Sequence, residues 1–159
     1  DGQKLTINWL TYPTRLEQPK LAEYAQSTLK DIGIDVEVNN TSDHRTFAEN
    51  GDFDVYVSST TTAPTGDPEY FFTSTVVGAK NYGNYQNEEV TKLTDQLHQT
   101  FDKDERGKLA VELQQKILDD DAFFFVSHLN MGIVTKSNVT GMAAHPCDYY
   151  EITADLDVE

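Results

Sequence analysis

The sequence predicts an α/β domain with a mixed sheet flanked by helices, and three observations carry that prediction. Residues 4–38 show the pattern strand, helix, strand, and residues 42–57 add a further helix and strand. Ala122–Val126 (AFFFV) is apolar on both faces, as a central strand covered on both sides would be. Strands that alternate with helices favour parallel pairs joined by right-handed crossovers.

The first half of the chain supplies the predicted β-α-β unit. Apolar and polar residues alternate over Lys4–Leu10, which predicts a strand with one face buried. Apolar residues recur at helical spacing over Pro19–Ile32, and Gly33 stands where a left-handed residue would end that helix. A second alternating run follows over residues 34–38. The three segments together predict two neighbouring parallel strands with a helix between them.

A second helix and a third strand follow at once. Ser42 or Asp43 can cap a short helix that runs to Asn50, and Gly51 is expected to break it. The third strand is predicted over residues 53–57, where apolar residues alternate again. This completes a second β-α-β step.

The third predicted strand ends in four hydroxyl residues, Ser59–Thr62, and a rigid turn. Ala63–Pro68 contains two prolines and a glycine, which restrict the backbone. Asp67 is expected to cap a short helix with Pro68 in its first position and Glu69 in its first turn. Ligands of open α/β sheets bind at the carboxyl ends of strands, so this stretch is a candidate ligand-facing edge. An ordinary surface crossover would show the same pattern.

Two helices are predicted in the second half, after a loop over residues 76–85. Asn87 is expected to cap the first, and Asp102 with Glu105 resembles a capping box at the start of the second. A short link between them favours antiparallel packing. The apolar stripes expected to face each other are Val90, Leu93, Leu97 and Phe101 on the first helix, and Leu109, Leu113 and Ile117 on the second.

The end of the chain is predicted to return to strands. Asp119–Asp121 should be solvated, because carboxylates oppose the dipole at a helix C-terminus. Ala122–Val126 is expected to be the most buried element, and Met131–Val134 a further strand. Residues 138–148 are expected to form a loop, and Tyr149–Ile152 a last extended piece.

Composition excludes several classes of function. The chain has 159 residues, enough for one domain or a large lobe, with 12 basic and 27 acidic residues and a net charge of −15. This charge repels phosphate backbones and anionic lipids, so neither nucleic acid nor a membrane surface is an expected partner. A solvated acidic surface is the simplest interpretation, and attraction for a cationic solute is the alternative.

The ends of the chain and its cysteine content bear on the compartment. No stretch approaches the ~20 apolar residues of a membrane span. The sequence begins at Asp1 without a methionine or a signal peptide, so we expect a mature or excised piece. A single cysteine, Cys147, leaves no internal disulfide, which fits the cytosol or a Gram-positive exterior.

Side chains that could carry chemistry are few. His44 and His98 are expected at ordinary surface positions, and His145 with Cys147 lacks the further ligands of a tetrahedral metal site. His128 follows the AFFFV run and is expected to be the most buried histidine, so it is the one candidate metal ligand. A hydrogen-bonded structural histidine is the favoured alternative at this position. The common nucleophile, zinc and phosphate-binding motifs are absent from the sequence, so an enzyme is not expected.

Four motifs in order resemble the family 5 extracytoplasmic solute-binding proteins, which are the dipeptide, oligopeptide and nickel receptors of ABC importers. They are LxxIGIxVE at Leu29–Glu37, GDFDVYVSSTTTAPTGDPEYFF at Gly51–Phe72, the paired helices of residues 87–120, and AFFFVSHLNMGIVTKSNVTG from Ala122. The resemblance covers almost all of the chain. It implies one lobe of a type II periplasmic-binding-protein-like fold, with residues 1–159 as the C-terminal lobe and 122–159 packing toward a missing lobe.

The resemblance also implies where a solute would bind. Peptide receptors of the family hold the ligand's amino terminus with an aspartate, and the corresponding residue here is Pro64. Ala63 and Pro64 instead match a run found in the family's nickel receptors, but the two aromatic residues of that run are threonines here. The histidine of those receptors falls near Lys80. A nickel chelate is therefore the favoured solute, with a peptide as the alternative. The residues expected to bind it are Thr60, Thr61, Thr62, Ala63 and Thr65.

The functional prediction is an extracytoplasmic receptor, in the periplasm or lipid-anchored at the cell surface, that closes two lobes over its solute. Its expected partners are a small-molecule or metal-chelate solute and the membrane permease of an ABC importer. We expect a monomer without a resident cofactor. A stand-alone cytosolic α/β adaptor or enzyme lobe is the remoter alternative.

Overall fold

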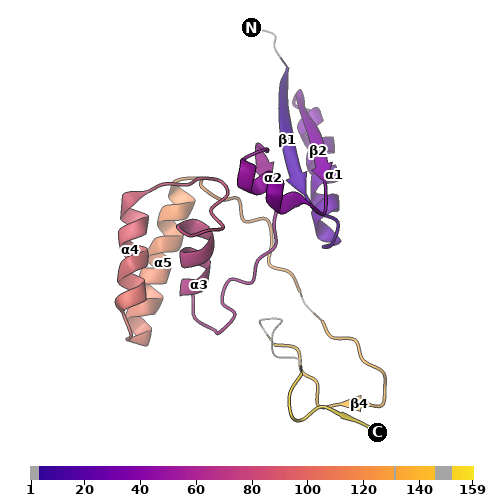
Figure 1. Cartoon of the computed structure of the whole chain (residues 1–159), viewed down its shortest axis with the longest axis vertical. Coiled ribbons are helices and arrows are strands. Elements are labelled where there is room, and N and C mark those ends of the chain that lie inside the picture. The colour runs from indigo at the N-terminus through magenta and orange to yellow at the C-terminus, as the bar shows by residue number, and fades with distance from the viewer. Residues whose placement is uncertain (1–3, 131, 146–151) are drawn as a thin grey trace. The chain divides into compact units, whose positions relative to one another are not determined.

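The computed structural model describes residues 4–130, 132–145 and 152–159, and the chain divides into two compact units (Figure 1). Unit 1 contains residues 1–60 and 82–84, and unit 2 contains residues 61–81 and 85–159. Unit 1 holds a parallel sheet and unit 2 a helical cluster. The predicted combination of helices and strands is confirmed.

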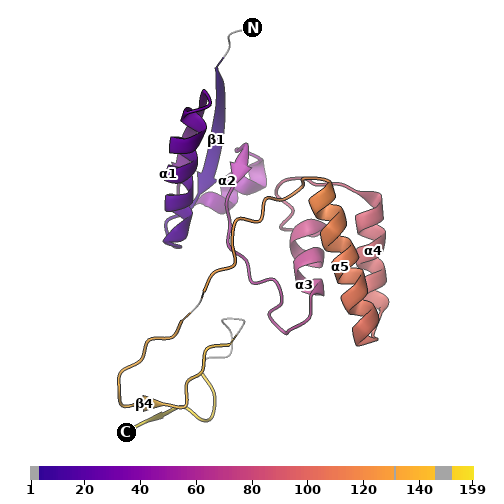
Figure 2. The ribbon, with the colours of Figure 1, turned by 180° about the vertical axis from the view of Figure 1, so that it is seen from behind.

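Unit 1 is the predicted series of strands and helices. Its elements are β1 (Leu5–Thr11), α1 (Glu17–Lys30), β2 (Ile34–Asn40), α2 (His44–Asn50) and β3 (Val55–Tyr56). The sheet order is β2-β1-β3, with both pairs parallel. Helix α1 packs along β2, as the ribbon shows from both sides (Figures 1 and 2). The central strand is therefore β1, and all three strands point the same way.

Two glycines end helical segments of unit 1 as predicted. Gly33 has φ +85° and Gly51 has φ +74°, both in the left-handed region that favours glycine. The N–H of Gly51 donates to the carbonyl of Ala48 at 3.2 Å. The helix boundaries were readable from the sequence because these signals are local.

The buried side chains of unit 1 differ in part from the predicted stripe. Leu10, Val36, Ala22 and Ala48 are buried. Leu5 is exposed, whereas Ile7 and Trp9 of the same predicted face are half-buried, because Leu5 is the first residue of β1. Ile32 is also exposed, because α1 ends before it and the residue no longer shares the helix face.

Unit 2 is built on helices. They are α3 (Glu69–Phe71), the π-helical turn η1 (Phe72–Val76), α4 (Glu88–Gln99) and α5 (Lys103–Asp119). The predicted caps are present: Asn87 Oδ1 accepts from the N–H groups of Glu89 and Val90, and Asp102 Oδ1 from those of Asp104 and Glu105. η1 continues the short helix predicted after Asp67 and reaches Val76, the first residue of the predicted loop.

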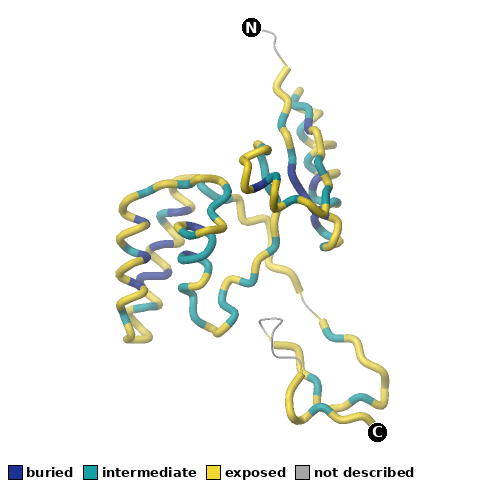
Figure 3. The backbone as a smooth tube through the Cα atoms, viewed as in Figure 1, coloured by how far each residue is buried: buried dark blue, intermediate teal, exposed yellow. Residues whose placement is uncertain are grey.

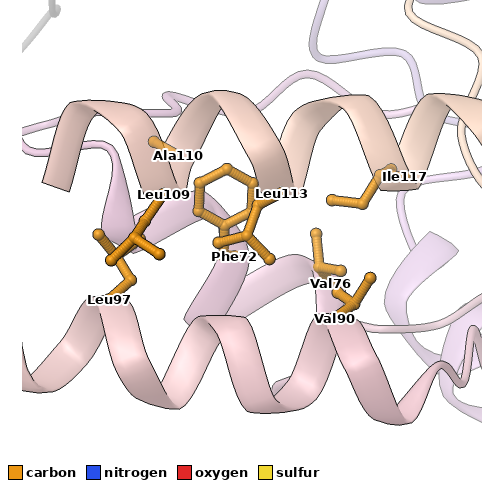
Figure 4. Packing of buried hydrophobic residues seen from close by; sticks show 8 residues of the cluster. All are labelled: Phe72, Val76, Val90, Leu97, Leu109, Ala110, Leu113 and Ile117. Carbon is orange, nitrogen blue, oxygen red and sulfur yellow. The ribbon is translucent and has the colours of Figure 1, made fainter. Parts of the chain in front are cut away.

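The core of unit 2 lies between η1 and the two long helices (Figure 4). Leu97 lies beside Leu109 at one end, and Val90 lies toward Ile117 at the other, so α4 and α5 pack antiparallel as predicted. Phe101 is 90 % exposed, because α4 ends at Gln99 and the predicted stripe ends with it. The buried cluster contains Phe72, Val76, Val90, Leu97, Leu109, Ala110, Leu113 and Ile117.

The prediction of a central buried strand at Ala122–Val126 is wrong. This stretch is not a strand, and Phe124 is 91 % exposed (Figure 3). A strand needs neighbours for its backbone groups. Within the described part of unit 2 the strands are β4 (Val139–Thr140) and β5 (Asp157–Val158), which pair antiparallel with each other.

Other predictions for the end of the chain are corrected too. Residues 132–134 are not a strand, and Val134 is 97 % exposed, while Met131 lies outside the described residues. β4 falls inside the predicted loop of residues 138–148, because residues 157–158 supply it with a partner. Of the predicted piece Tyr149–Ile152, only Ile152 is described, and it is exposed without regular structure. Asp119–Asp121 are exposed, as predicted.

Candidate functional site

The carboxyl ends of the three parallel strands meet at one edge of unit 1. Tyr12 directly follows β1, His44 begins α2 soon after β2, and Tyr56 ends β3. Backbone hydrogen bonds hold this edge together beyond the strands, from Thr41 N–H to the Thr11 carbonyl and from Val57 N–H to the Leu10 carbonyl, each at 3.0 Å. In an open α/β sheet this edge is where ligands bind.

Four aromatic side chains, here called the aromatic group, gather at this edge: Tyr12, His44, Tyr56 and Tyr82. The rings of Tyr12 and His44 stack with centroids 4.1 Å apart and 23° between their planes. His44 Nδ1 lies 2.7 Å from the Tyr56 hydroxyl, and the Tyr82 ring meets Tyr56 edge-on at 5.8 Å. The group offers flat apolar faces together with phenol and imidazole polar atoms.

Burial favours the uncharged forms of Tyr56 and His44 within the aromatic group. Burial, with the nearby phenols of Tyr12 and Tyr82, raises the pKa of Tyr56 to about 12. Burial, followed by the charge of Arg45, lowers the pKa of His44 below its ordinary value. The Tyr56 phenol therefore stays protonated, and the His44 imidazole stays neutral.

Polar groups continue the edge beside the aromatic group. Ser59 N–H donates to the Tyr12 hydroxyl at 3.1 Å, and Ser59 Oγ donates to Glu17 Oε1 at 2.9 Å. The buried Gln18 amide lies 2.7 Å from Ser59 Oγ. Thr11 is fully buried, and its Oγ1 has no hydrogen-bond partner among the described residues. Glu17 is the carboxylate of this hydrogen-bonded set.

The predicted binding residues are divided between the two units along the sequence. Thr60 ends the first segment of unit 1, whereas Thr61, Thr62, Ala63 and Thr65 belong to unit 2. Within the described residues, none of the four threonine hydroxyls has a side-chain hydrogen bond, and all four are exposed or half-buried. Their role in binding stays a prediction.

The turn after these threonines has the predicted geometry. Gly66 N–H donates to the Ala63 carbonyl at 3.0 Å, and Gly66 has φ +78°. Asp67 Oδ1 accepts from the Glu69 N–H at 2.9 Å, at the start of α3. This bond is the predicted contact of Asp67 with the helix start, but α3 begins one residue later than predicted, at Glu69, with Pro68 in the N-cap position.

Asp67 has a second partner that the sequence did not reveal. The Arg106 guanidinium donates to both carboxylate oxygens of Asp67, at 2.6 to 3.0 Å, and to Glu69 Oε2 at 2.8 Å. These hydrogen bonds hold the pKa of both carboxyls below their ordinary values. Asp67 is thus paired with Arg106 inside unit 2.

The histidines differ from their predicted environments. His128 is exposed and not partly buried, because the stretch before it is not a covered strand. His44 is half-buried in the aromatic group and not at an ordinary surface position. His98 is exposed, as predicted, with Nδ1 2.6 Å from Glu69 Oε1. Cys147 lies outside the described residues. Among the described residues, no group of three or more His, Cys, Asp or Glu side chains could hold a metal ion.

Sequence reasoning missed Tyr12, His44 and Tyr56 as site residues. Tyr12 and Tyr56 lie at or just after the end of a predicted strand, and His44 begins the helix that follows one, so the rule that ligands bind at carboxyl ends could have drawn attention to all three. It was applied only to the third strand.

Comparison with known proteins decides the family. Residues 1–83 match the family of bacterial extracellular solute-binding proteins, family 5 Middle. The chain belongs to this family. As a family 5 protein it is 27 % identical over 158 residues to the nickel-binding protein NikA of Staphylococcus aureus, a match covering 98 % of this chain and 32 % of NikA. It is also 27 % identical to the oligopeptide-binding protein AppA of Bacillus subtilis, covering 96 % and 29 %.

Solved structures agree with the family. The crystal structure of NikA from Staphylococcus aureus in complex with Ni(L-His)2 superposes with a TM-score of 0.77 at 26 % identity, over 98 % of this chain and 34 % of that one. The nickel ABC transporter structure from Bacillus halodurans gives 0.67 at 35 % identity, over 75 % and 26 %. AppA from Bacillus subtilis in complex with a nonapeptide gives 0.76 at 27 % identity, over 94 % and 31 %.

The fold class of this family 5 protein is confirmed by these neighbours, which are type II periplasmic binding proteins. The chain spans about a third of the length of the relatives that it matches. No helix of the described residues has the length and apolar character needed to cross a membrane.

Proposed function

We propose that the chain is the C-terminal lobe of the substrate-binding component of an ABC importer, which captures a solute outside the cytoplasm by closing two lobes. Family membership and the one-third share of its relatives' length support this. The receptor would deliver its solute to a membrane permease, acting as a monomer by binding and not by catalysis. It would work in the periplasm or lipid-anchored at the cell surface.

The favoured solute is nickel held in a small organic chelator. Two relatives are nickel proteins by name, and one of them was crystallised with Ni(L-His)2. The observation that supports the choice is that the four threonine side chains of the predicted site carry no charge, while the charge of the neighbouring Asp67 is balanced by Arg106. Hydroxyl groups alone would leave a bare buried cation poorly solvated, whereas they can donate to and accept from a chelator.

In this proposal the chelator contacts Thr60, Thr61, Thr62, Ala63 and Thr65, with at most one histidine from this part of the receptor. Unit 1 has its own candidate metal ligand, His44, whose Nδ1 lies 2.7 Å from the Tyr56 hydroxyl at the carboxyl edge of the sheet. A neutral imidazole whose other nitrogen is hydrogen-bonded is the form that binds metals.

A peptide is the second candidate. AppA matches at the same identity as NikA, and Glu17 places a carboxylate at the carboxyl edge, where it could receive a peptide's amino group. A Glu17→Gln variant separates the two solutes. It should weaken peptide binding in the peptide model, because an ammonium–carboxylate pair is lost, and should leave an uncharged chelate almost unaffected.

Small-angle scattering of the full-length receptor tests the function. A closing receptor becomes more compact when its solute binds, since the closed state makes contacts that the open state lacks. Compaction with nickel and free histidine is expected. No compaction with nickel chelates or with short peptides would contradict the proposal.

The remoter alternative, a stand-alone cytosolic adaptor or enzyme lobe, predicts a different reading frame from that of a receptor. A receptor's reading frame continues upstream of Asp1 by a few hundred residues and an export signal. A frame that starts near Asp1 would reject the receptor in favour of that alternative.

A further inference from the structure

A polar side chain of unit 1 is buried beside the end of β3. Gln18, in the first turn of α1, is only 1 % exposed. A carboxamide loses its hydrogen bonds to water when it is buried, and that loss is costly unless protein groups replace them. The groups around Gln18 therefore indicate what this side chain does.

The Gln18 carboxamide bonds the backbone just beyond β3. In the orientation that satisfies both ends of the amide, Nε2 donates to the Val57 carbonyl at 3.1 Å and Oε1 accepts from the Ser59 N–H at 3.2 Å. A neighbouring parallel strand would bond the same two groups, the carbonyl of one residue and the N–H of the residue two further along. Gln18 thus takes the place of a neighbouring strand beside residues 57–59.

This role matters because the sheet ends at this point. β3 is two residues long, and directly after it the Val57 N–H still donates to the Leu10 carbonyl of β1 at 3.0 Å. Two residues later the Ser59 N–H is bonded by side chains instead, the Tyr12 hydroxyl at 3.1 Å and the Gln18 amide. Side chains therefore hold the backbone where the strand ladder stops.

The residue that follows is the first of the predicted binding residues. Thr60 comes directly after Ser59 and ends the first segment of unit 1. Consecutive Cα atoms are about 3.8 Å apart, so fixing Ser59 confines Thr60 to its immediate surroundings. A hydroxyl contributes to binding only when it lies within hydrogen-bond reach of the solute. Gln18 can therefore affect binding without touching the solute.

We infer that Gln18 is a positioning residue for solute binding: its carboxamide holds the backbone of residues 57–59 and so places Thr60 at the carboxyl edge of the sheet. The inference rests on the proposed function, in which Thr60 contacts the solute. Gln18 acts through the backbone and not by contact, because its own side chain is buried.

Gln26 provides a matched control on the same helix. Its Nε2 donates to the Val36 carbonyl at 2.8 Å, so it also joins α1 to a strand backbone, but within β2. Replacing either glutamine by methionine removes one carboxamide and keeps a side chain of similar length. Of the two variants, only Gln18→Met releases the backbone before Thr60.

Amide exchange in the solute-free full-length receptor tests the hold on the backbone. The Ser59 amide should exchange about tenfold faster in Gln18→Met than in the wild type, and at the wild-type rate in Gln26→Met. Equal acceleration in the two variants would overturn the inference, because it would reflect a general loss of stability. An unchanged rate in Gln18→Met would overturn it as well.

A double-mutant cycle with Thr60 tests the effect on binding. Thr60→Val should weaken the binding of nickel with free histidine by about fivefold in the wild type and in Gln26→Met. In Gln18→Met the loss should be less than about twofold, because the hydroxyl is already misplaced. A general loss of stability would leave the effect of Thr60→Val unchanged, so equal losses in all three backgrounds would contradict the inference. A Thr60→Val variant with wild-type affinity would also contradict it.

The two experiments separate the positioning residue from the proposed function. Exchange is measured without solute, so a receptor that binds neither nickel chelates nor peptides would lose the proposed function while the Ser59 amide still decided whether Gln18 holds the backbone. A receptor that binds solute but shows unchanged exchange in Gln18→Met would keep its function and lose the positioning residue.

Discussion

Arg106 and Asp67 form a forked ion pair that joins three segments of unit 2. Arg106 Nε and Nη2 donate to the two oxygens of Asp67, and Nη2 also donates to Glu69 Oε2. Arg106 Nη1 donates to the carbonyls of Leu97 and Thr100, each at 2.6 Å. One side chain thus satisfies the last carbonyls of α4 and fixes the start of α3.

Removing this arginine should destabilise the chain. Arg106→Met keeps part of the apolar stem but leaves Asp67, Glu69 and the α4 carbonyls without their donor, so the free energy of unfolding should fall by about 2 kcal/mol. Lys108→Met is the matched control, since it removes one positive charge from an exposed position on the same helix. Denaturant unfolding of both variants is the measurement, and equal losses would mean that net charge, not the fork, matters.

The same pair predicts a pH dependence. The hydrogen bonds from Arg106 lower the pKa of Asp67 from 3.8 and that of Glu69 from 4.5. The unfolded chain therefore takes up protons first as the pH falls below 4.5, so the stabilisation is complete above that pH and is lost in acid. The difference in unfolding free energy between wild type and Arg106→Met should be constant from pH 7 to about pH 5 and shrink below. A difference that persists unchanged at about pH 3 would argue against the ion pair.

Two glycines should respond oppositely to alanine. A Cβ on Gly78 would lie 1.9 Å from the Thr73 carbonyl oxygen, so Gly78→Ala must displace backbone and should cost about 2 kcal/mol. Gly107 lies inside α5 with no atom within 4 Å of the added Cβ, so Gly107→Ala should stabilise by about 1 kcal/mol. Thermal unfolding of the two variants should move Tm in opposite directions, and shifts of the same sign would contradict the packing around η1.

The parts of the fold that the sequence predicted correctly are governed by neighbours in the chain. Asn87 and Asp102 cap their helices because each bonds N–H groups two and three residues ahead, and Gly51 adopts a conformation that other residues avoid. Ala122–Val126 has the composition of a buried strand, yet the described chain provides no neighbour for it. Its composition therefore indicates a preference for burial that the described residues do not satisfy.

The candidate site was harder to predict than the fold. Ser59–Thr62 was recognised from a local pattern, but the meeting of Tyr12, His44 and Tyr56 depends on the register of three parallel strands. The tie between Asp67 and Arg106 spans 39 residues and leaves no periodic signal. Such contacts follow from the fold and not from spacing along the chain.

The threonine hydroxyls offer a direct test of the proposed contacts. Thr61→Val and Thr62→Val each remove one hydroxyl while keeping the side-chain shape, so each should weaken solute binding by the full-length receptor by about fivefold. Thr28→Val is the control, because its Oγ1 donates to the Tyr24 carbonyl within α1. Calorimetric titration is the measurement, and affinities unchanged in both site variants would remove the threonines from the site.

Calorimetry on the full-length receptor tests the central claim that the cargo is a nickel chelate. Nickel added with free histidine should bind much more tightly than bare nickel, because the hydroxyl and aromatic groups can complement a chelator but cannot replace the water around a free cation. Metal-free peptides should bind weakly or not at all. Equal affinity for bare nickel and for nickel with histidine would contradict the claim, and tight binding of metal-free peptides would identify a peptide receptor instead.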